Sequence, residues 1–564
     1  MTGGTLNLCA TSGAGTGNGS IDCNSNCTFQ TGGTFNITSS TTTNASNGRG
    51  NLTVGGNFIH TTSAASFLRT ATLATAAGTV TIDGSVAQTI ESTNGFTGTI
   101  TFNITQSAVV AARTTVPLTK TFTVNSGTTL NVNDNSANSG YDLQVTSSGV
   151  LKVSGTMNVN SAAVLDLLGN AITDAATGGG TFNLISDAGL ITQHAQGITT
   201  LASGATGCIQ VTGGRSYSSG ADYTYNSSTA AQVTGNGLPA SLVGSSNLTI
   251  NNTYYPTPLT NGGVTLSQAT TTAGTLTLTS ERLITTAANL MTIDAAGTAT
   301  SGSMVSQSNF SFVDGPIKKV GSSAAFVFPT GDIYLATGSV RTAKWARIEI
   351  PLTTFTSADA FTAEYHKLDD PCATNQAVSN TNAAGINNVS YKEYWDLTRV
   401  TGTLLPSVKL YWEDNSQSTS LGSAISSAIP ADLIVAEFDG GMWNNKGATG
   451  ITTAGITGTI TSNVATTFTT GTIMPFTFGS PTGVNPLPVE LLSFNGYPYG
   501  SSNMLEWKTA TETNCNHFEL ERSGDGIRFT PIASVDGYGT TTELQNYGQR
   551  DHEPFPGKNY YRLN

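Results

Sequence analysis

Short segments in which apolar and polar residues alternate recur along residues 1–300. Examples are FTVNSGTTLNVN at 122–133, LQVTSSGVLKVSGTMNVN at 143–160 and AGTLTLTSERLITTAANLMTID at 273–294. Alternation with a period of two, rich in Val, Ile, Leu, Phe and Thr, predicts strands with one apolar face, separated here by Gly, Ser and Asn turns. The side chains that we expect to point inward are Leu130, Val132, Leu151, Val153, Val159, Leu276 and Leu278.

The spacing of these strands favours an all-β fold that begins with a parallel β-solenoid, similar to a β-helix. Such short strands, close together and repeated over hundreds of residues, suit a coil in which each turn buries the apolar face of its neighbour. A pair of β-sandwiches is the alternative, because the pattern is irregular between Gly189 and Pro256. We predict that residues 1–300 are nearly free of helix and that their strands stack in parallel.

Residues 303–484 carry longer, aromatic-rich strand candidates such as FSFVDGPIKKVG, WARIEIPL and KEYWDLTRV. Their spacing is typical of an antiparallel β-sandwich. Trp395, Trp412 and Trp443 lie on separate predicted strands. We expect them to fill one core rather than to line a groove for sugars.

Residues 487–564 predict a further small β domain. Leu505 and Trp507 alternate inward on one strand, and Phe518, Leu520 and Arg522 alternate on the next, before a tight turn at Asp525–Gly526. Tyr560 and Tyr561 stand where a β-sandwich of the immunoglobulin kind carries its tyrosine corner.

The string LPVELLSF…LEWKTATET…FELERSGDGIRFTPIASVDGYG…YYRL resembles the fibronectin type III-like module of secreted Bacteroidetes surface proteins, which are adhesin-like. In that family the module precedes a sorting domain for type IX secretion. The segments SFVDGPIKKVG…FVFPTGD and EYWDLTRVTGT resemble upstream parts of the same proteins more loosely, and Cys515 departs from the pattern at a position that is otherwise polar. The resemblance implies export by the type IX machinery and a place outside the cell or at its surface. It also implies seven strands in the module, of which six can be counted before Asn564, so we expect the last strand to be missing.

Composition supports a secreted β protein of several domains. Charged residues make up 10% of the 564 residues, against about 25% in an average soluble protein, so Thr, Ser, Asn and Gly must supply solubility. The net charge of −12 argues against nucleic acid as a partner, and no apolar run is long enough to insert into a membrane. The first residues, MTGGTLNLCATSG, lack the features of a signal peptide. We therefore expect a piece of a longer precursor.

The distribution of charged residues along the chain also indicates a domain boundary. All five tryptophans and most charged residues follow a composition shift near residues 295–302. We therefore expect three domains: the solenoid at 1–300, the β-sandwich at 303–484 and the fibronectin type III-like domain at 487–564.

No catalytic or cofactor-binding residue can be assigned. A polysaccharide-degrading β-helix enzyme collects carboxylates on one face for calcium or for acid–base chemistry. Here the acids of the first region are scattered singly: Asp83, Glu91, Asp134, Asp142, Asp166, Asp174, Asp187 and Asp222. His60 and His194 have no acidic neighbour, and the Gly-rich GAGTGNG is not followed by the GK[ST] of a phosphate loop.

Two places leave the question of a metal open. Asp134 and Asp142 in NDNSANSGYD are compatible with calcium, although a solvated turn is the favoured interpretation. The cluster of His366 with Asp369 and Asp370 is the one place to check for another metal ion.

The six cysteines do not form a clear site. Cys9, Cys23 and Cys27 suit a disulfide whose connectivity the sequence leaves open. A zinc site would need a fourth ligand, and the nearest histidine is His60. Cys208, Cys372 and Cys515 are expected to be small buried apolar residues.

These patterns predict a non-catalytic structural or adhesive surface protein whose solenoid presents a binding or spacer surface. Weak contacts repeated along such a surface suit carbohydrate or surface ligands. The alternatives are a subunit of an extracellular filament, which would associate with itself, and a polysaccharide-degrading β-helix enzyme.

Overall fold

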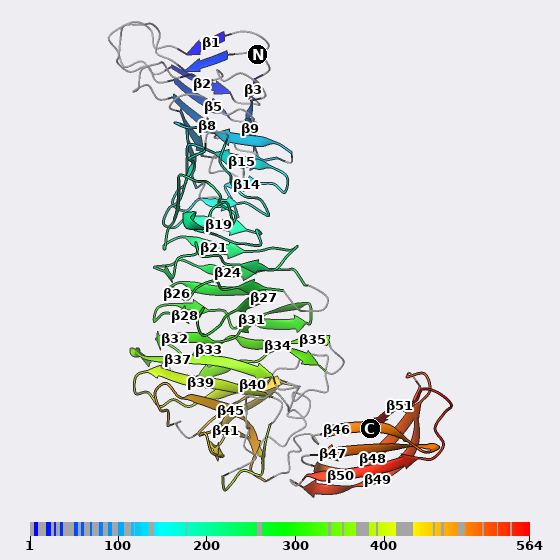
Figure 1. The fold of residues 1–564 in the computed structure, drawn as a ribbon. Helices are drawn as coiled ribbons and strands as arrows, with labels where there is room; N and C mark the ends of the chain where they lie inside the picture. The colour runs from blue at the N-terminus through cyan, green and yellow to red at the C-terminus, as the bar shows by residue number, and fades with distance from the viewer. Residues whose placement is uncertain are drawn as a thin grey trace. The chain divides into compact units, whose positions relative to one another are not determined.

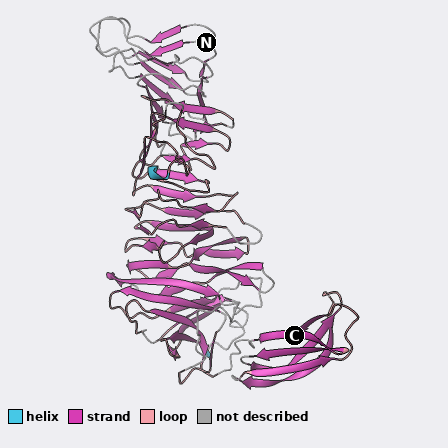
Figure 2. Ribbon diagram, in the orientation of Figure 1, coloured by secondary structure: helices cyan, strands magenta, loops and turns pink. Residues whose placement is uncertain are grey.

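The structure is a computed structural model, and it is all-β (Figure 2). It describes residues 5–8, 19–23, 27–29, 34–37, 50–54, 58–60, 68–69, 78–82, 88–92, 100–105, 114–117, 119–134, 140–175, 178–255, 262–336, 340–351, 355–367, 383–390, 393–412, 432–454, 457–463, 467–482, 491–509, 512–526, 528–541 and 544–563. Among these, helical structure comprises the 3-10 turn η1 (Leu201–Ser203) and one further 3-10 residue, Asp432. The chain divides into two compact units. Unit 1 comprises Met1–Ile333, Val340–Trp345 and Thr353–Glu364, and unit 2 comprises Tyr334–Ser339, Ala346–Leu352 and Tyr365–Asn564.

Unit 1 is built from ladders of parallel strands, which lie one above another in Figure 1. Ladder 1 contains β2 (Gly19–Cys23), β5 (Gly50–Val54), β8 (Gly78–Ile82), β10 (Ile100–Ile104), β13 (Thr129–Val132), β16 (Thr156–Val159), β18 (Thr181–Leu184) and β20 (Gly214–Tyr217). Ladder 2 contains β3 (Cys27–Phe29), β6 (Phe58–His60), β9 (Gln88–Ser92), β12 (Thr121–Val124) and β15 (Val150–Val153). A smaller set pairs β1 (Thr5–Leu8), β4 (Thr34–Ile37) and β7 (Leu68–Arg69).

Three more ladders follow along the chain. Ladder 3 starts at Gln88 of β9 and continues through β11 (Thr114–Val116), β14 (Leu143–Val145), β17 (Val164–Asp166), β19 (Gly189–Thr192), β21 (Asp222–Tyr225), β24 (Leu248–Asn251), β27 (Thr275–Ile284) and β29 (Thr298–Ala299). Ladder 4 contains β22 (Gln232–Val233), β25 (Val264–Thr265), the end of β27, β31 (Asn309–Asp314) and β34 (Thr330–Ala336). Ladder 5 contains β23 (Ser241–Leu242), β26 (Thr270–Thr272), β28 (Met291–Ile293) and β32 (Ile317–Ser322).

The core of unit 1 is the apolar layer that these ladders enclose. All seven side chains predicted to point inward are buried, with exposed fractions between 0% and 6%. Phe102 of ladder 1 meets Phe122 of ladder 2 edge to face, with ring centroids 5.0 Å apart. Alternation therefore placed these side chains correctly, because in a strand every second residue faces the same way.

Parallel pairing continues past the composition shift at residues 295–302. Glu281–Ile284 pair in parallel with Ser311–Asp314, and Met291–Ile293 pair with Ile317–Lys319. Antiparallel pairs also appear in this part: β30 (Ser303–Ser306) pairs with β31, and β32 pairs with β37 (Phe355–Lys367). Aromatic residues thus become frequent after the composition shift, but the parallel ladders do not end there. Unit 1 also includes β33 (Phe326–Phe328) and β35 (Val340–Trp345).

Unit 2 begins with antiparallel sheets. One contains β38 (Asn388–Val389), β39 (Glu393–Thr401), β45 (Ile473–Ser480), β41 (Ile434–Phe438) and β42 (Trp443–Asn445). Another contains β36 (Ile348–Ile350), β40 (Lys409–Trp412), β44 (Thr457–Thr461) and β43 (Thr449–Ala454).

The three tryptophans of this part are buried, but they do not share one core. Trp395 and Trp412 both pack edge to face on Phe478, with centroids 5.5 and 5.9 Å apart. Trp443 belongs to a separate cluster with Ile386 and neighbouring residues. The prediction of a single core was wrong because β42 lies beyond β41, on the side away from β45.

Within the described residues, the end of unit 2 contains six antiparallel strands in two sheets. β46 (Leu491–Tyr499), β47 (Ser502–Thr509) and β50 (Gln545–Asp551) form one sheet. β49 (Thr530–Thr541), β48 (Glu512–Ser523) and β51 (Tyr560–Leu563) form the other. Trp507, Phe518 and Tyr547 fill the core of this module.

Candidate binding face

The outward positions of ladder 1 form two columns of uncharged polar residues. The first, the Thr column, contains Thr79, Thr101, Thr129, Thr156 and Thr181, which are register partners on five successive strands. The second, the Asn column, contains Asn103, Asn131, Asn158 and Asn183, which are partners on four of them. All nine side chains are half-buried, and the apolar residues between them are fully buried. The columns therefore lie on the surface of the ladder.

The Asn column is a continuous hydrogen-bonded chain. The amide of Asn131 donates to Asn103 at 3.0 Å, Asn158 donates to Asn131 at 2.9 Å and Asn183 donates to Asn158 at 2.9 Å. Each inner asparagine thus uses one N–H and one acceptor site within the column. An amide offers two donors and an oxygen with two lone pairs, so half of its capacity is left for other partners.

The Thr column has no corresponding bonds. Within the described residues, no hydrogen bond is formed by the hydroxyl groups of these five threonines. Their spacing follows the strands, which lie about 4.8 Å apart in a sheet. The hydroxyl groups are therefore available to solvent or to a ligand.

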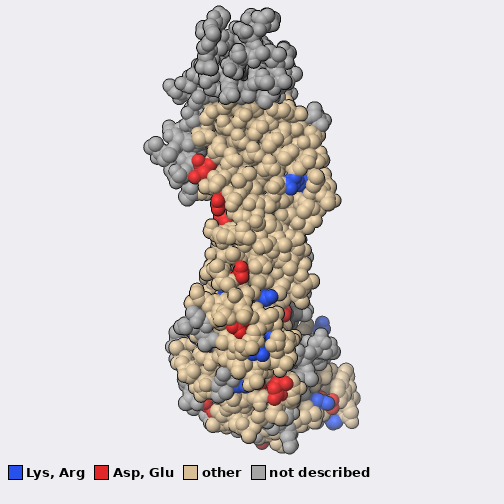
Figure 3. All heavy atoms as spheres, turned by 90° about the vertical axis from the view of Figure 1, so that its left-hand side faces the viewer, with Lys and Arg blue, Asp and Glu red and all other residues tan. Residues whose placement is uncertain are grey.

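Other columns of polar positions in unit 1 are mixed, and some of their members are buried. The matching column of ladder 3 contains Thr115, Gln144, Asp166, Ile191, Thr224, Thr249 and Thr277. Figure 3 shows one side of unit 1, on which acidic and basic residues are few and scattered. Uniform composition is thus a property of ladder 1 and not of every face.

The scattered acids of the first region are used in structure. Asp142 accepts a hydrogen bond from the backbone of Val164 at 2.8 Å, and Asp222 accepts one from Asn247 at 2.7 Å. Asp174 binds the hydroxyl of Thr212 at 2.5 Å. The carboxylate of Asp142 is thus directed to the next strand, which does not support the calcium interpretation with Asp134.

Two further acids are held in the same way. Burial raises the pKa of Asp166, which accepts a bond from Gln144 at 2.6 Å. Glu91 pairs with Lys120 at 3.3 Å. Within the described residues, no group of three or more His, Cys, Asp or Glu side chains could hold a metal ion. Asp83, Asp369 and Asp370 lie outside the described residues, so the predicted metal cluster of His366 with Asp369 and Asp370 stays a prediction.

A buried acidic group that the sequence analysis missed lies where β27 passes from ladder 3 to ladder 4. Glu281 is 1% exposed and has a left-handed φ of 60°. Burial raises its pKa to about 7, although Arg282 opposes this shift. Arg282 in turn pairs with Asp314 at 3.1 Å. The only signal in the sequence was a Glu–Arg pair within an otherwise uncharged ladder segment.

A buried lysine, Lys319, is surrounded by backbone carbonyl groups of the turn at residues 294–297. The ammonium of Lys319 donates to the carbonyl oxygens of Asp294 at 2.6 Å and Gly297 at 2.9 Å. It also lies 5.2 Å from the ring centroid of Phe326. Burial lowers its pKa to about 8. Because its donors are satisfied by a turn, this lysine stabilises the fold.

The polar clusters of unit 2 are also paired internally. His366 contacts Asp396 at 3.1 Å and stacks on Tyr394, with ring centroids 4.6 Å apart. Lys409 pairs with Glu349 at 3.0 Å.

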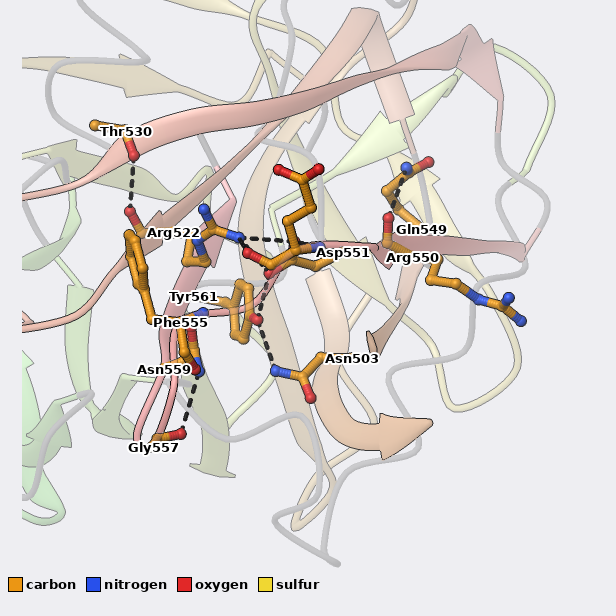
Figure 4. A network of polar contacts seen from close by, with 11 residues as sticks. Asn503, Arg522, Thr530, Gln549, Arg550, Asp551, Phe555, Gly557, Asn559 and Tyr561 are labelled. Carbon is orange, nitrogen blue, oxygen red and sulfur yellow. Dashed lines mark hydrogen bonds and ion pairs between the residues drawn. The ribbon is translucent and has the colours of Figure 1, made fainter. Parts of the chain in front are cut away.

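Figure 4 shows the network that joins the two sheets of the terminal module. Arg522 of β48 pairs with Asp551 of β50 at 2.8 Å, and the hydroxyl of Tyr561 donates to Asp551 at 2.7 Å. Asn503 of β47 donates to Tyr561 at 2.8 Å. Although burial acts to raise it, these hydrogen bonds lower the pKa of Asp551. In a tyrosine corner the tyrosine hydroxyl bonds to the backbone. Here the hydroxyl of Tyr561 donates to the Asp551 carboxylate instead, so Tyr561 does not form the predicted corner.

One cysteine and one surface hollow of unit 1 can be described. Cys208 is buried and unpaired, and burial raises the pKa of its thiol to about 12. Cys9 and Cys372 lie outside the described residues, so the connectivity of Cys9, Cys23 and Cys27 stays open. A hollow of about 210 Å³ on unit 1 is lined by Ala195, Ala231, Gln232, Val233, Gly262, Thr265 and Ile284, which provide no acid or base.

No family model, curated protein or solved structure matches this chain. In the described part of the chain, no helix has the length and apolar character needed to cross a membrane.

Proposed function

We propose that the chain is a non-catalytic structural or adhesive protein of the cell surface, exported by type IX secretion. In this proposal the ladders of unit 1 form a β-solenoid that presents a binding or spacer surface. The terminal module is of the fibronectin type III kind, and the ligands are carbohydrates or other surfaces.

The observation that carries the proposal is the pair of uncharged columns on ladder 1. Thr129, for example, has a threonine as register partner on each side, Thr101 and Thr156. A regular surface of this kind suits many weak contacts with a repeated ligand, which together give useful avidity. A catalytic site would instead need a few converging groups with shifted pKa values in a cleft.

The use of the acids supports a role without catalysis. The carboxylates of Asp142, Asp166, Asp174 and Asp222 each bind a neighbouring strand or turn. Glu281 has a raised pKa but is almost completely buried. An acid that no substrate can reach serves the fold.

The support for export comes from the last region. Its six antiparallel strands and the Trp507 core are compatible with the module that the sequence resembles. Low charge, with solubility supplied by Thr, Ser, Asn and Gly, fits an extracellular location.

Electron microscopy of the purified chain, combined with a glycan-array screen, tests the proposal. We expect separate particles that bind glycans or cell surfaces. Long polymers without glycan binding would favour a filament subunit instead. Turnover of a polysaccharide would contradict the proposal and favour the β-helix enzyme.

A further inference from the structure

We propose that the outward face of ladder 1, from β8 to β18, is a binding site for a neutral linear polysaccharide. The inference rests on the proposed adhesive function and names the ligand class and the surface that binds it. The binding groups are the hydroxyls of the Thr column and the free amide positions of the Asn column.

The strands of this face are regularly spaced. From β8 to β18 the strands pair residue for residue, without a shift in register. Neighbouring members of a column are therefore separated by one strand spacing, about 4.8 Å. This repeat is similar in length to one sugar ring of an extended polysaccharide, so successive rings can meet equivalent groups.

The face is also free of charged side chains. No outward position of β8, β10, β13, β16 or β18 carries an acidic or basic residue. A uronate or sulfated polymer would leave its charges unpaired on this face. A neutral polymer matches it, because hydroxyl and amide groups both donate and accept hydrogen bonds, as sugar hydroxyls do.

A ladder of this kind can fold with other residues at these positions. The equivalent column of ladder 3 accommodates Gln144, Asp166 and Ile191 between its threonines. The asparagines of the Asn column bond to one another, so stability alone explains why they are present. The Thr column gains no such bond within the described residues. Threonine suits a strand through its β-branched shape, and its five outward hydroxyls stay available for contacts outside the chain.

A pair of matched variants of the full chain tests the inference. Thr129→Arg with Thr156→Arg places two charged side chains on adjacent strands of the face. Thr224→Arg with Thr249→Arg makes the same change on adjacent strands of ladder 3. Thr129→Val with Thr156→Val removes the hydroxyls and keeps the β-branched shape, so it remains informative if the arginine variant does not fold.

The measurement compares retention on polygalacturonate beads, ice crystals and cells with co-sedimentation on insoluble β-1,4-glucan, chitin and α-glucan particles, at low salt and at about 1 M NaCl. We expect the wild type and the ladder 3 variant to bind one of these polymers at both salt concentrations. We expect the ladder 1 arginine variant to bind at least about tenfold more weakly, and the valine variant to lose affinity severalfold.

The possible failures are distinguishable. If the wild type binds but both ladder 1 variants bind equally well, this face is not the site, and the proposed function stands. Binding of polygalacturonate alone, or of ice alone, overturns the neutral polysaccharide. If the wild type binds no polysaccharide and no cell surface, the proposed function fails as well.

Discussion

Asn158 donates a side-chain hydrogen bond of 2.9 Å to Asn131, its register partner on the neighbouring strand. Its own side-chain oxygen accepts a bond from Asn183, also at 2.9 Å. One residue type repeated at one register thus connects four strands that are far apart in the sequence. The strands of ladder 1 are therefore held together by side-chain hydrogen bonds as well as by backbone pairing.

Replacing Asn158 by Ala should therefore destabilise unit 1. The substitution removes two side-chain hydrogen bonds, each of which contributes about 0.5–1.5 kcal/mol. We expect the free energy of unfolding, measured with denaturant, to fall by about 1–3 kcal/mol. Thr156→Val is the control in the Thr column, where we expect a change within about 0.5 kcal/mol. Equal effects of the two substitutions would contradict the role of the Asn column.

The buried Glu281 predicts an unusual dependence of stability on pH. Its pKa is about 7 in the folded protein, against 4.5 for the ordinary side chain. Between these values the folded state holds a proton that the unfolded state releases, so stability should fall as pH rises through this window and then level off. The difference corresponds to about 3 kcal/mol.

Glu281→Gln tests this prediction because it keeps the shape and removes the titration. The variant should lose the decline between about pH 4.5 and pH 7 and should be more stable than the wild type above it. Thermal midpoints of both proteins across this range provide the measurement. Parallel curves for the two proteins would show that Glu281 does not titrate in this way.

The network around Asp551 predicts that two adjacent tyrosines have unequal roles. Tyr561→Phe removes bonds to Asp551 and Asn503, at a cost of about 1–3 kcal/mol. Tyr560 is 40% exposed, so Tyr560→Phe is the matched control. Hydrogen exchange measured by mass spectrometry should become faster in β50 and β51 for the first variant only. Similar exchange in both variants would mean that the network does not hold the two sheets together.

The aromatic core of unit 2 depends on Phe478, which contacts both Trp395 and Trp412. Phe478→Ala should destabilise this part by about 3–5 kcal/mol, because it leaves a cavity between two large side chains. The change in tryptophan fluorescence during unfolding reports the effect. An unchanged transition would show that the two tryptophans do not rely on this contact.

Much of the ladder architecture could be predicted, because alternation alone decides which side of a strand is buried. Leu130 and Leu276 were placed inward for that reason, and both are fully buried. The contacts of Lys319 with Asp294 and Gly297 depend on register, which local patterns do not specify. The same holds for Arg522 and Asp551, which are brought together by the packing of two sheets. The Asn and Thr columns were visible as repeated TLNV and TMNV strings, but only the register shows that they align.

In the proposed function, this chain binds surfaces and does not degrade them. The most direct measurement incubates the purified full chain with immobilised polysaccharides and follows both the bound protein and the released reducing ends. We predict that protein is retained on at least one polysaccharide and that no reducing ends appear above the blank. Release of reducing ends that increases with protein concentration would contradict the account.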